Sequence, residues 1–230
     1  MSIAENLEQV REEIAAACRR AGRADEDVTL MAVSKVHPVE AICEAYAAGQ
    51  RLFGENRVQE FQQKSESLLG LKDARFHLIG PLQSNKTKKA VELFNAIDAV
   101  DSLKTAERLE AAAKALGKRL PILIEVKLSH EESKHGVAPD KLLALLDALR
   151  GFEAIEAAGL MTVPPWSEDA ELARPYFSEL RRLRDLAAKT HPGVTQLSMG
   201  MSNDFAVAIE EGSTSVRIGT AIFGKRTVLK

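Results

Sequence analysis

One lysine follows directly on an apolar run that is typical of a buried strand. Residues 28–34 are apolar on both faces, as expected in a parallel sheet covered by helices, and Lys35 comes next. We expect an amine in this position to be partly desolvated, which disfavours its charged form and lowers its pKa. A neutral amine is a nucleophile that can form a Schiff base with an aldehyde. The alternative is a lysine whose stem packs while its ammonium reaches solvent.

Two segments near the carboxyl terminus have the composition of an anion site. Ser198-Met199-Gly200 precedes the helix-start sequence Ser202-Asn203-Asp204, and Gly219-Thr220 follows the last apolar run. Glycines let backbone N–H groups approach an anion, and helix starts favour negative charge. A ligand with an aldehyde and a phosphate, such as pyridoxal 5′-phosphate (PLP), would suit both this site and Lys35. Arg217 could then hydrogen-bond the ring nitrogen.

These residues must be positioned by a repeating order of strands and helices. After an initial helical segment, 3–22, apolar runs alternate with segments of helical periodicity. Eight strands alternating with helices predict a parallel sheet, and eight is the number that closes a (β/α)8 TIM barrel. The fold class is therefore α/β, with an extra amino-terminal helix and a single domain over 1–230; a doubly wound open sheet is the alternative. The expected strands are 28–34, 51–54, 75–79, 96–100, 120–127, 154–161, 194–198 and 214–219, and the later helices are 38–48, 56–69, 84–93, 103–116, 139–150, 168–190 and 203–211.

In either architecture ligands bind at the carboxyl ends of the strands, where the unusual residues of this chain recur. Each of these residues could instead have a structural role that involves no ligand. Arg217 could pair with Glu125 or Glu156 inside the barrel, and 202–204 could cap a helix with no ligand nearby. His77, on an apolar strand, could be a hydrogen-bonded core histidine. The recurrence of such residues at strand ends favours a binding site.

Composition limits the partners and the compartment. The formal net charge of −2 over 230 residues shows no excess of positive charge with which to bind nucleic acid or an anionic membrane. No apolar run approaches the length of a membrane span, and the polar amino terminus does not resemble a signal peptide. Cys18 and Cys43 lie in helical patterns without metal-binding spacing, as is typical of a reducing compartment. We therefore expect a cytoplasmic protein.

Five motifs are spread over the chain, at Ala32–Lys35, Phe53–Glu60, His77–Lys86, Ser198–Asp204 and Val216–Gly224. Together they resemble those of the pyridoxal phosphate homeostasis proteins, also called the YggS or PROSC family. The resemblance implies a fold similar to the amino-terminal barrel domain of alanine racemase. It also implies that Lys35 forms the Schiff base, that Arg217 faces the ring nitrogen and that Asn56 lies beside the cofactor. The phosphate would lie on Ser198-Met199 and Gly219-Thr220, and His77 completes the candidate cofactor-binding residues.

The resemblance further implies a role in intracellular vitamin B6 homeostasis without catalytic turnover. The protein would hold PLP as a reversible Schiff base for storage, buffering or delivery to PLP-accepting apo-enzymes. The alternative is a small PLP-dependent amino-acid racemase. Against it, the sequence ends at Lys230, so we expect neither the carboxy-terminal β-domain of alanine racemase nor its second base, and we expect a monomer. Lys86 or Lys134 could form an auxiliary PLP site.

Overall fold

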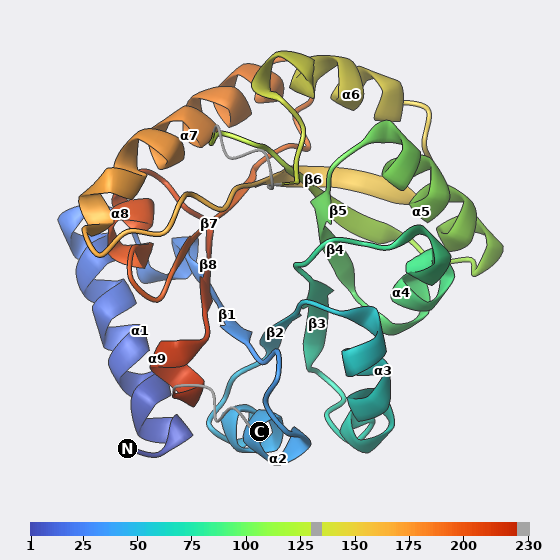
Figure 1. Cartoon of the computed structure of the whole chain (residues 1–230). Helices are drawn as coiled ribbons and strands as arrows, with labels where there is room; N and C mark the ends of the chain where they lie inside the picture. Colours follow the sequence, from blue (N-terminus) through green and yellow to red (C-terminus); the bar gives the residue numbers. More distant parts are fainter. Residues whose placement is uncertain (130–134, 225–230) are drawn as a thin grey trace.

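The chain folds into a closed barrel of eight parallel strands surrounded by helices (Figure 1). The computed structural model describes residues 1–129 and 135–224. Because β8 pairs with β1 as well as with β7, the sheet has no open edge. The (β/α)8 prediction is confirmed and the open-sheet alternative is wrong. The strands are β1 (Thr29–Val33), β2 (Leu52–Glu55), β3 (Arg75–Leu78), β4 (Ala96–Val100), β5 (Leu120–Glu125), β6 (Ile155–Met161), β7 (Gln196–Met201) and β8 (Ser215–Ile218).

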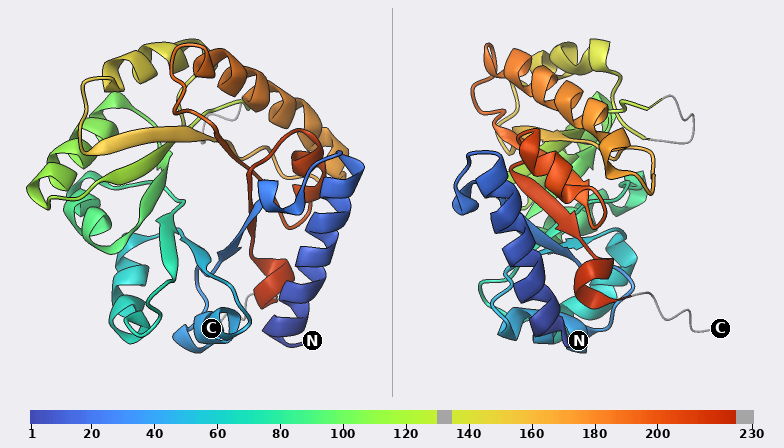
Figure 2. Two further views of the ribbon diagram at one scale, coloured as in Figure 1. Left: turned by 180° about the vertical axis from the view of Figure 1, so that it is seen from behind. Right: turned by 90° about the vertical axis from the view of Figure 1, so that its left-hand side faces the viewer.

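Helices follow the strands and cover the outside of the barrel (Figures 1 and 2). The segment expected as one helix over 168–190 begins instead with a short 3-10 turn, η5 (Ala170–Ala173), before its α-helix starts. The helices between strands are α2 (Val39–Ala47), α3 (Val58–Ser65), α4 (Thr87–Leu93), α5 (Leu103–Ala115), α6 (Leu142–Leu149), α7 (Arg174–Ala188) and α8 (Phe205–Glu210).

The expected extra amino-terminal helix is α1 (Ile3–Arg20). It starts in a capping box, in which Ser2 Oγ accepts the Glu5 N–H and the Glu5 carboxylate accepts the Ser2 N–H. Beyond β8 the part of the chain that the structure describes, up to residue 224, forms a one-turn helix, α9 (Thr220–Phe223). The buried face of α1 packs against α8 and α9, so α1 covers the flank of the barrel that α9 is too short to cover (Figure 2).

The barrel has two apolar layers of unequal size. The large layer lies between the strands and the outer helices, and it includes Cys18. The small one, inside the barrel, consists of Ala99, Leu123 and Met161. Charged residues such as Asp98 and Arg217 are also buried. Among the helices of the described residues, none is both long and apolar enough to cross a membrane.

One strand boundary differs from the prediction in a way that affects the site. The strand expected over 194–198 is β7, which runs from Gln196 to Met201. Ser198 pairs with Met161 of β6, and Met201 pairs with Arg217 of β8, so the ladder continues past the serine and glycine that indicated a strand end. The carboxyl end of this strand therefore lies three residues further along the chain.

Candidate cofactor site

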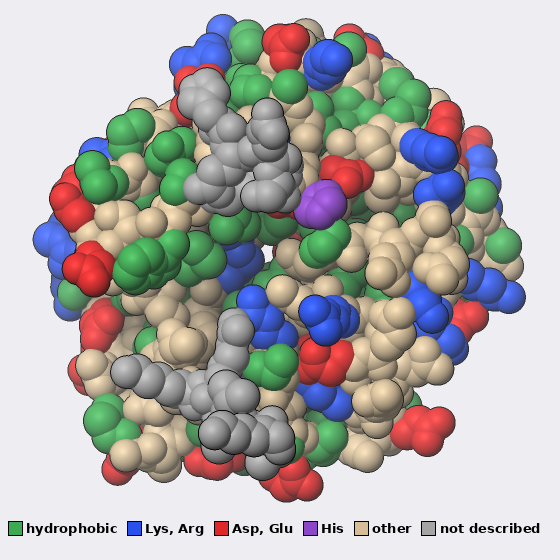
Figure 3. Space-filling model, viewed as in Figure 1, with side chains coloured by type: hydrophobic (Ala, Val, Ile, Leu, Met, Phe, Trp, Pro, Cys, Tyr) green, Lys and Arg blue, Asp and Glu red, His purple; other side chains and the backbone are tan. Residues whose placement is uncertain are grey.

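A cavity of about 550 Å³ opens at the carboxyl ends of β1, β7 and β8. Figure 3 shows this face of the barrel, with a hollow at its centre and Lys and Arg side chains beside it. The structure brings five of the predicted residues together in the cavity wall, namely Lys35, Asn56, Arg217, Gly219 and Thr220. The other described residues that line it are Val33, His37, Ile79, Val163, Trp166, Ser167, Met201, Ser202, Asn203 and Asp204.

Lys35 is half-buried in the turn that follows β1. Its predecessor, Ser34, is buried and donates a 2.7 Å hydrogen bond from Oγ to Oε1 of Glu55, at the end of β2. Two residues after the lysine, the ring of His37 stacks on Phe223 of α9, with 4.9 Å between ring centroids. The turn is therefore attached to the end of β2 and to α9, the short helix that follows β8.

Arg217 is a buried residue of the cavity wall, with 4% of its surface exposed. Its Nη1 donates to Ser198 Oγ at 2.7 Å, and its Nη2 donates to the Thr162 carbonyl at 2.8 Å. Burial lowers the pKa of Arg217, although the nearby carboxylates, Asp98 first, act in the opposite direction. Its hydrogen bonds thus go to a hydroxyl and a carbonyl, while of the two ion-pair partners considered above, Glu156 is exposed on β6 and the charge of Glu125 acts on Arg217.

Ser198 and Met199 are completely buried within β7, and neither is among the described residues that line the cavity. The reason is the longer strand, which brings Met201–Asp204 to the wall instead. Gly200 has φ of +96°, and a Cβ there would lie 2.6 Å from Cβ of Ala208, so glycine lets α8 pack on the strand end.

The side chain of Asp204 makes no capping hydrogen bond to α8, although its position in the sequence suggested one. Its Oδ1 accepts the Met201 N–H at 2.6 Å, so the carboxylate turns back toward β7 and closes the loop before α8. Burial raises the pKa of Asp204, while the Met201 hydrogen bond and the charge of Arg217 oppose that shift. The loop that forms one wall of the cavity is therefore fixed by its own buried acid.

His77 also lies outside the described cavity wall. Its Nδ1 is 3.2 Å from Oδ1 of the buried Asp98 on β4. This contact agrees with the interpretation of His77 as a partnered histidine of the barrel interior.

Asn56 forms part of the wall of both this cavity and a neighbouring cleft of about 900 Å³. Gly80, after β3, approaches it so closely that a Cβ would lie 2.4 Å from the Asn56 carbonyl oxygen. The cleft is lined by the start of α3 and the β3–α4 loop, including Lys86. Lys134, the other auxiliary candidate, lies outside the described residues.

Sequence reasoning missed the loop that follows β6. Val163, Trp166 and Ser167 line the cavity, and Trp166 has 76% of its surface exposed. Asn203 Nδ2 donates to the Ser167 carbonyl at 2.8 Å, which joins this loop to the one after β7. The available signal was the sequence Pro164-Pro165-Trp166 at a strand end, with the one tryptophan of the chain.

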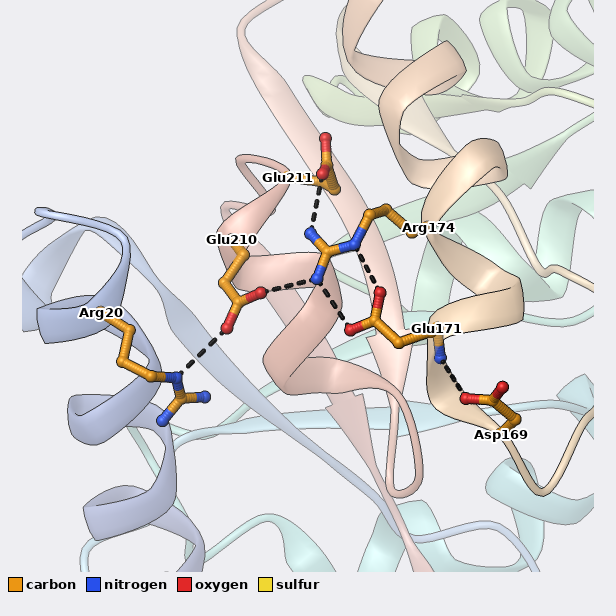
Figure 4. Close-up of polar contacts among 6 residues, drawn as sticks. All are labelled: Arg20, Asp169, Glu171, Arg174, Glu210 and Glu211. Carbon is orange, nitrogen blue, oxygen red and sulfur yellow. Dashed lines mark hydrogen bonds and ion pairs between the residues drawn. The ribbon is translucent and has the colours of Figure 1, made fainter.

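An ion-pair network supports the same side of the barrel from outside (Figure 4). Arg174, in α7, pairs with Glu210 at 2.8 Å and with Glu211 at 2.9 Å, and it also pairs with Glu171 of η5 at 2.7 Å. Glu210 pairs in turn with Arg20 of α1 at 3.2 Å. The network joins α1, α7 and the end of α8 behind the loop that closes the cavity.

Comparison with known proteins defines the class to which this fold and site belong. Residues 5–227 match the family model of the alanine racemase N-terminal domain. A solved alanine racemase from Clostridium difficile is 14% identical, with a TM-score of 0.70, and the match covers 99% of this chain and 58% of that one. At this identity the likeness shows the shared barrel fold.

More similar relatives define the family itself. The pyridoxal phosphate homeostasis proteins of Aquifex aeolicus and Escherichia coli are 44% and 43% identical to this chain, and each match covers at least 98% of both chains. The structure of PipY from Synechococcus elongatus with PLP bound has a TM-score of 0.87 at 41% identity, covering 97% of this chain and 100% of that one. The chain therefore belongs to the family of pyridoxal phosphate homeostasis proteins.

Proposed function

We propose that this protein binds PLP through a reversible Schiff base to Lys35 and so serves in vitamin B6 homeostasis, by storing, buffering and delivering the cofactor. The observation that supports the proposal is that a half-buried primary amine and a buried guanidinium line the same cavity. PLP supplies an aldehyde that condenses reversibly with a primary amine. The cavity has room for a ligand of this size, and its wall offers both the amine and groups for an anion.

The remaining wall residues would hold the rest of the cofactor. We place the phosphate on the loop 201–204 and on Gly219-Thr220, which reach the cavity, with Ser198 and Met199 acting behind them. Asn56 would lie beside the cofactor, and Arg217 would face its ring nitrogen. Ser198 would contribute by holding Arg217 in place through their 2.7 Å hydrogen bond.

The charge of Arg217 favours a carrier over a racemase. A guanidinium donates hydrogen bonds and accepts none, so a ring nitrogen opposite it would be unprotonated. An unprotonated ring withdraws electrons less well and stabilises carbanions poorly. A reversible covalent bond suits a carrier, because it keeps free aldehyde low and can be exchanged to an acceptor lysine. We expect PLP-accepting apo-enzymes as partners, a monomeric state and a location in the cytoplasm.

Two assays test the proposal. PLP-loaded protein mixed with a PLP-dependent apo-enzyme should restore that enzyme's activity while the loaded protein loses its visible absorbance; Lys35→Ala should neither load nor deliver. Incubation with single L-amino acids in deuterated water should leave their Cα hydrogens unexchanged. Steady Cα deuteration would favour the racemase instead, and loading of Lys35→Ala to the same extent would contradict the role of Lys35.

A further inference from the structure

The turn that contains Lys35 has an unfavourable backbone conformation at the next residue. Val36 has φ of +61°, in the left-handed region that β-branched residues rarely adopt. Val36 has 57% of its surface exposed, so packing of the valine does not account for this conformation. Backbone strain of this kind persists only where surrounding contacts hold it. The contacts that hold it here come from α3.

Glu60, in the first turn of α3, bonds directly to the strained residue. The Val36 N–H donates to Oε1 of Glu60 at 2.5 Å. Lys64 Nζ, one helical turn further, donates to the same oxygen at 2.8 Å. Burial acts to raise the pKa of Glu60, but the bonds from Lys64 and Val36 outweigh it and the pKa is lowered. The acceptor is thus a carboxylate that two donors hold in place.

The residue before Lys35 is bound to the same network. Lys64 Nζ also donates to the Ser34 carbonyl and to Glu55 Oε1, both at 3.3 Å. Glu55 Oε1 in turn accepts the Ser34 hydroxyl at 2.7 Å. Both neighbours of Lys35 in the chain are therefore fixed to α3 and the end of β2, and Lys35 lies between two anchored residues.

From this geometry we infer that Glu60 is a positioning residue, which holds the strained Val36 turn so that the Lys35 amine is directed to the cofactor aldehyde. The inference rests on the proposed function. In the step concerned, Lys35 Nζ forms a double bond to the aldehyde carbon, and the aldehyde oxygen leaves as water with the two amine protons. Glu60 exchanges no proton in this step; it sets where the amine meets the carbonyl.

The test separates covalent attachment from binding of the phosphate and ring. The equilibrium constant for attachment is measured from the visible absorbance with PLP. Non-covalent affinity is measured by Trp166 fluorescence with pyridoxine 5′-phosphate, which lacks the aldehyde. Glu60→Ala should reduce the attachment constant about tenfold, because the released turn relaxes away from the strained conformation. Its affinity for pyridoxine 5′-phosphate should stay unchanged.

Two variants serve as controls. Glu60→Gln should stay close to the wild type, because its amide oxygen can accept from both Val36 and Lys64. Glu92→Ala removes a surface glutamate that pairs with Lys89 on α4, and it should change neither constant. Val36→Gly removes the strain at residue 36. In that background, Glu60→Ala should therefore reduce the attachment constant much less than it does in the wild type. If Glu60→Ala alone does not fold, Val36→Gly is compared with the Val36→Gly, Glu60→Ala double variant instead.

Each outcome is decisive. A wild type that forms no covalent adduct overturns the proposed function and this inference with it. A wild type that forms the adduct, with Glu60→Ala equal to it, overturns the inference alone. Equal loss of PLP attachment and pyridoxine 5′-phosphate affinity also overturns it, since Glu60 would then support the cavity in general. An undiminished effect of Glu60→Ala in the Val36→Gly background excludes the strained turn as the cause.

Discussion

The guanidinium of Arg217 donates a 2.7 Å hydrogen bond to Oγ of Ser198, and this bond joins β8 to β7 inside the barrel. Both residues are buried. Arg217 is among the described residues that line the cavity, and Ser198 is not. The contact that the structure shows for this serine is therefore with the arginine and not with the cavity. It restricts the rotamer of the arginine that would face the cofactor ring.

Replacing Ser198 by alanine should weaken both the fold and the site. The lost hydrogen bond leaves a buried guanidinium with one partner fewer, which should lower the free energy of unfolding by about 1–3 kcal/mol. PLP affinity should fall severalfold as Arg217 gains freedom. Urea denaturation and PLP titration measure the two effects. Ser65→Ala, at an exposed helix end where Oγ donates to the Gln62 carbonyl, is the control and should change neither quantity.

Trp166 should report occupancy of the cavity. It is the one tryptophan of the chain, it is largely exposed, and it lines the cavity. Titration with PLP should quench its emission in parallel with the appearance of visible absorbance. Trp166→Phe should lose the fluorescence signal and keep the absorbance change. Unaltered emission at saturating PLP would show that the cofactor binds away from the β6–η5 loop.

Glu110, far from the cavity, should make stability fall at low pH. Burial opposes its ionisation, but the backbone N–H groups of Glu153, Ala154 and Ile155 and the ammonium of Lys114 lower the pKa of Glu110 to about 2. A pKa below the ordinary value means that this stabilisation is present above about pH 4.5 and is lost as the pH falls toward about 2.

The comparison that checks this is a pH series of unfolding free energies. Glu110→Gln should be less stable than the wild type near neutral pH, and the difference should shrink between about pH 4.5 and about pH 2. Glu107→Gln, an exposed position on the same helix, should follow the wild-type curve. A difference that stays constant over this range would contradict the assigned pKa.

The Arg174 network should stabilise the barrel more than an isolated surface pair does. Arg174→Gln removes contacts to three glutamates and should lower the free energy of unfolding by about 1 kcal/mol. Arg182→Gln removes a single exposed pair with Glu179 and should have a smaller effect. Thermal unfolding at low and high salt measures both. Equal losses in the two variants would mean that the network adds nothing beyond a single pair.

Much of this architecture could be predicted from the sequence because its signals are local. Runs that are apolar on both faces, separated by helical periodicity, indicated the eight strands, and the barrel order followed from their number. Lys35 and Arg217 were predictable because charged residues inside or directly after such runs are rare. They also meet in one cavity, as expected of carboxyl strand ends in a barrel.

Other features depend on contacts between distant segments. The end of β7 is set by pairing with β6 and β8, so local composition placed it three residues early and assigned Ser198 and Met199 to the cavity wall. The left-handed backbone of Val36 has no sequence signal, because valine is among the residues least suited to it. The role of Glu60 becomes visible only when α3 lies beside the Lys35 turn.

Whether Lys35 forms the Schiff base can be measured by reducing the PLP-loaded protein with borohydride and mapping the modified lysine by peptide mass spectrometry. We expect the pyridoxyl group on Lys35, and we expect Lys35→Ala to lose this label. Stoichiometric labelling of another lysine, Lys86 for example, with Lys35 unmodified would contradict it.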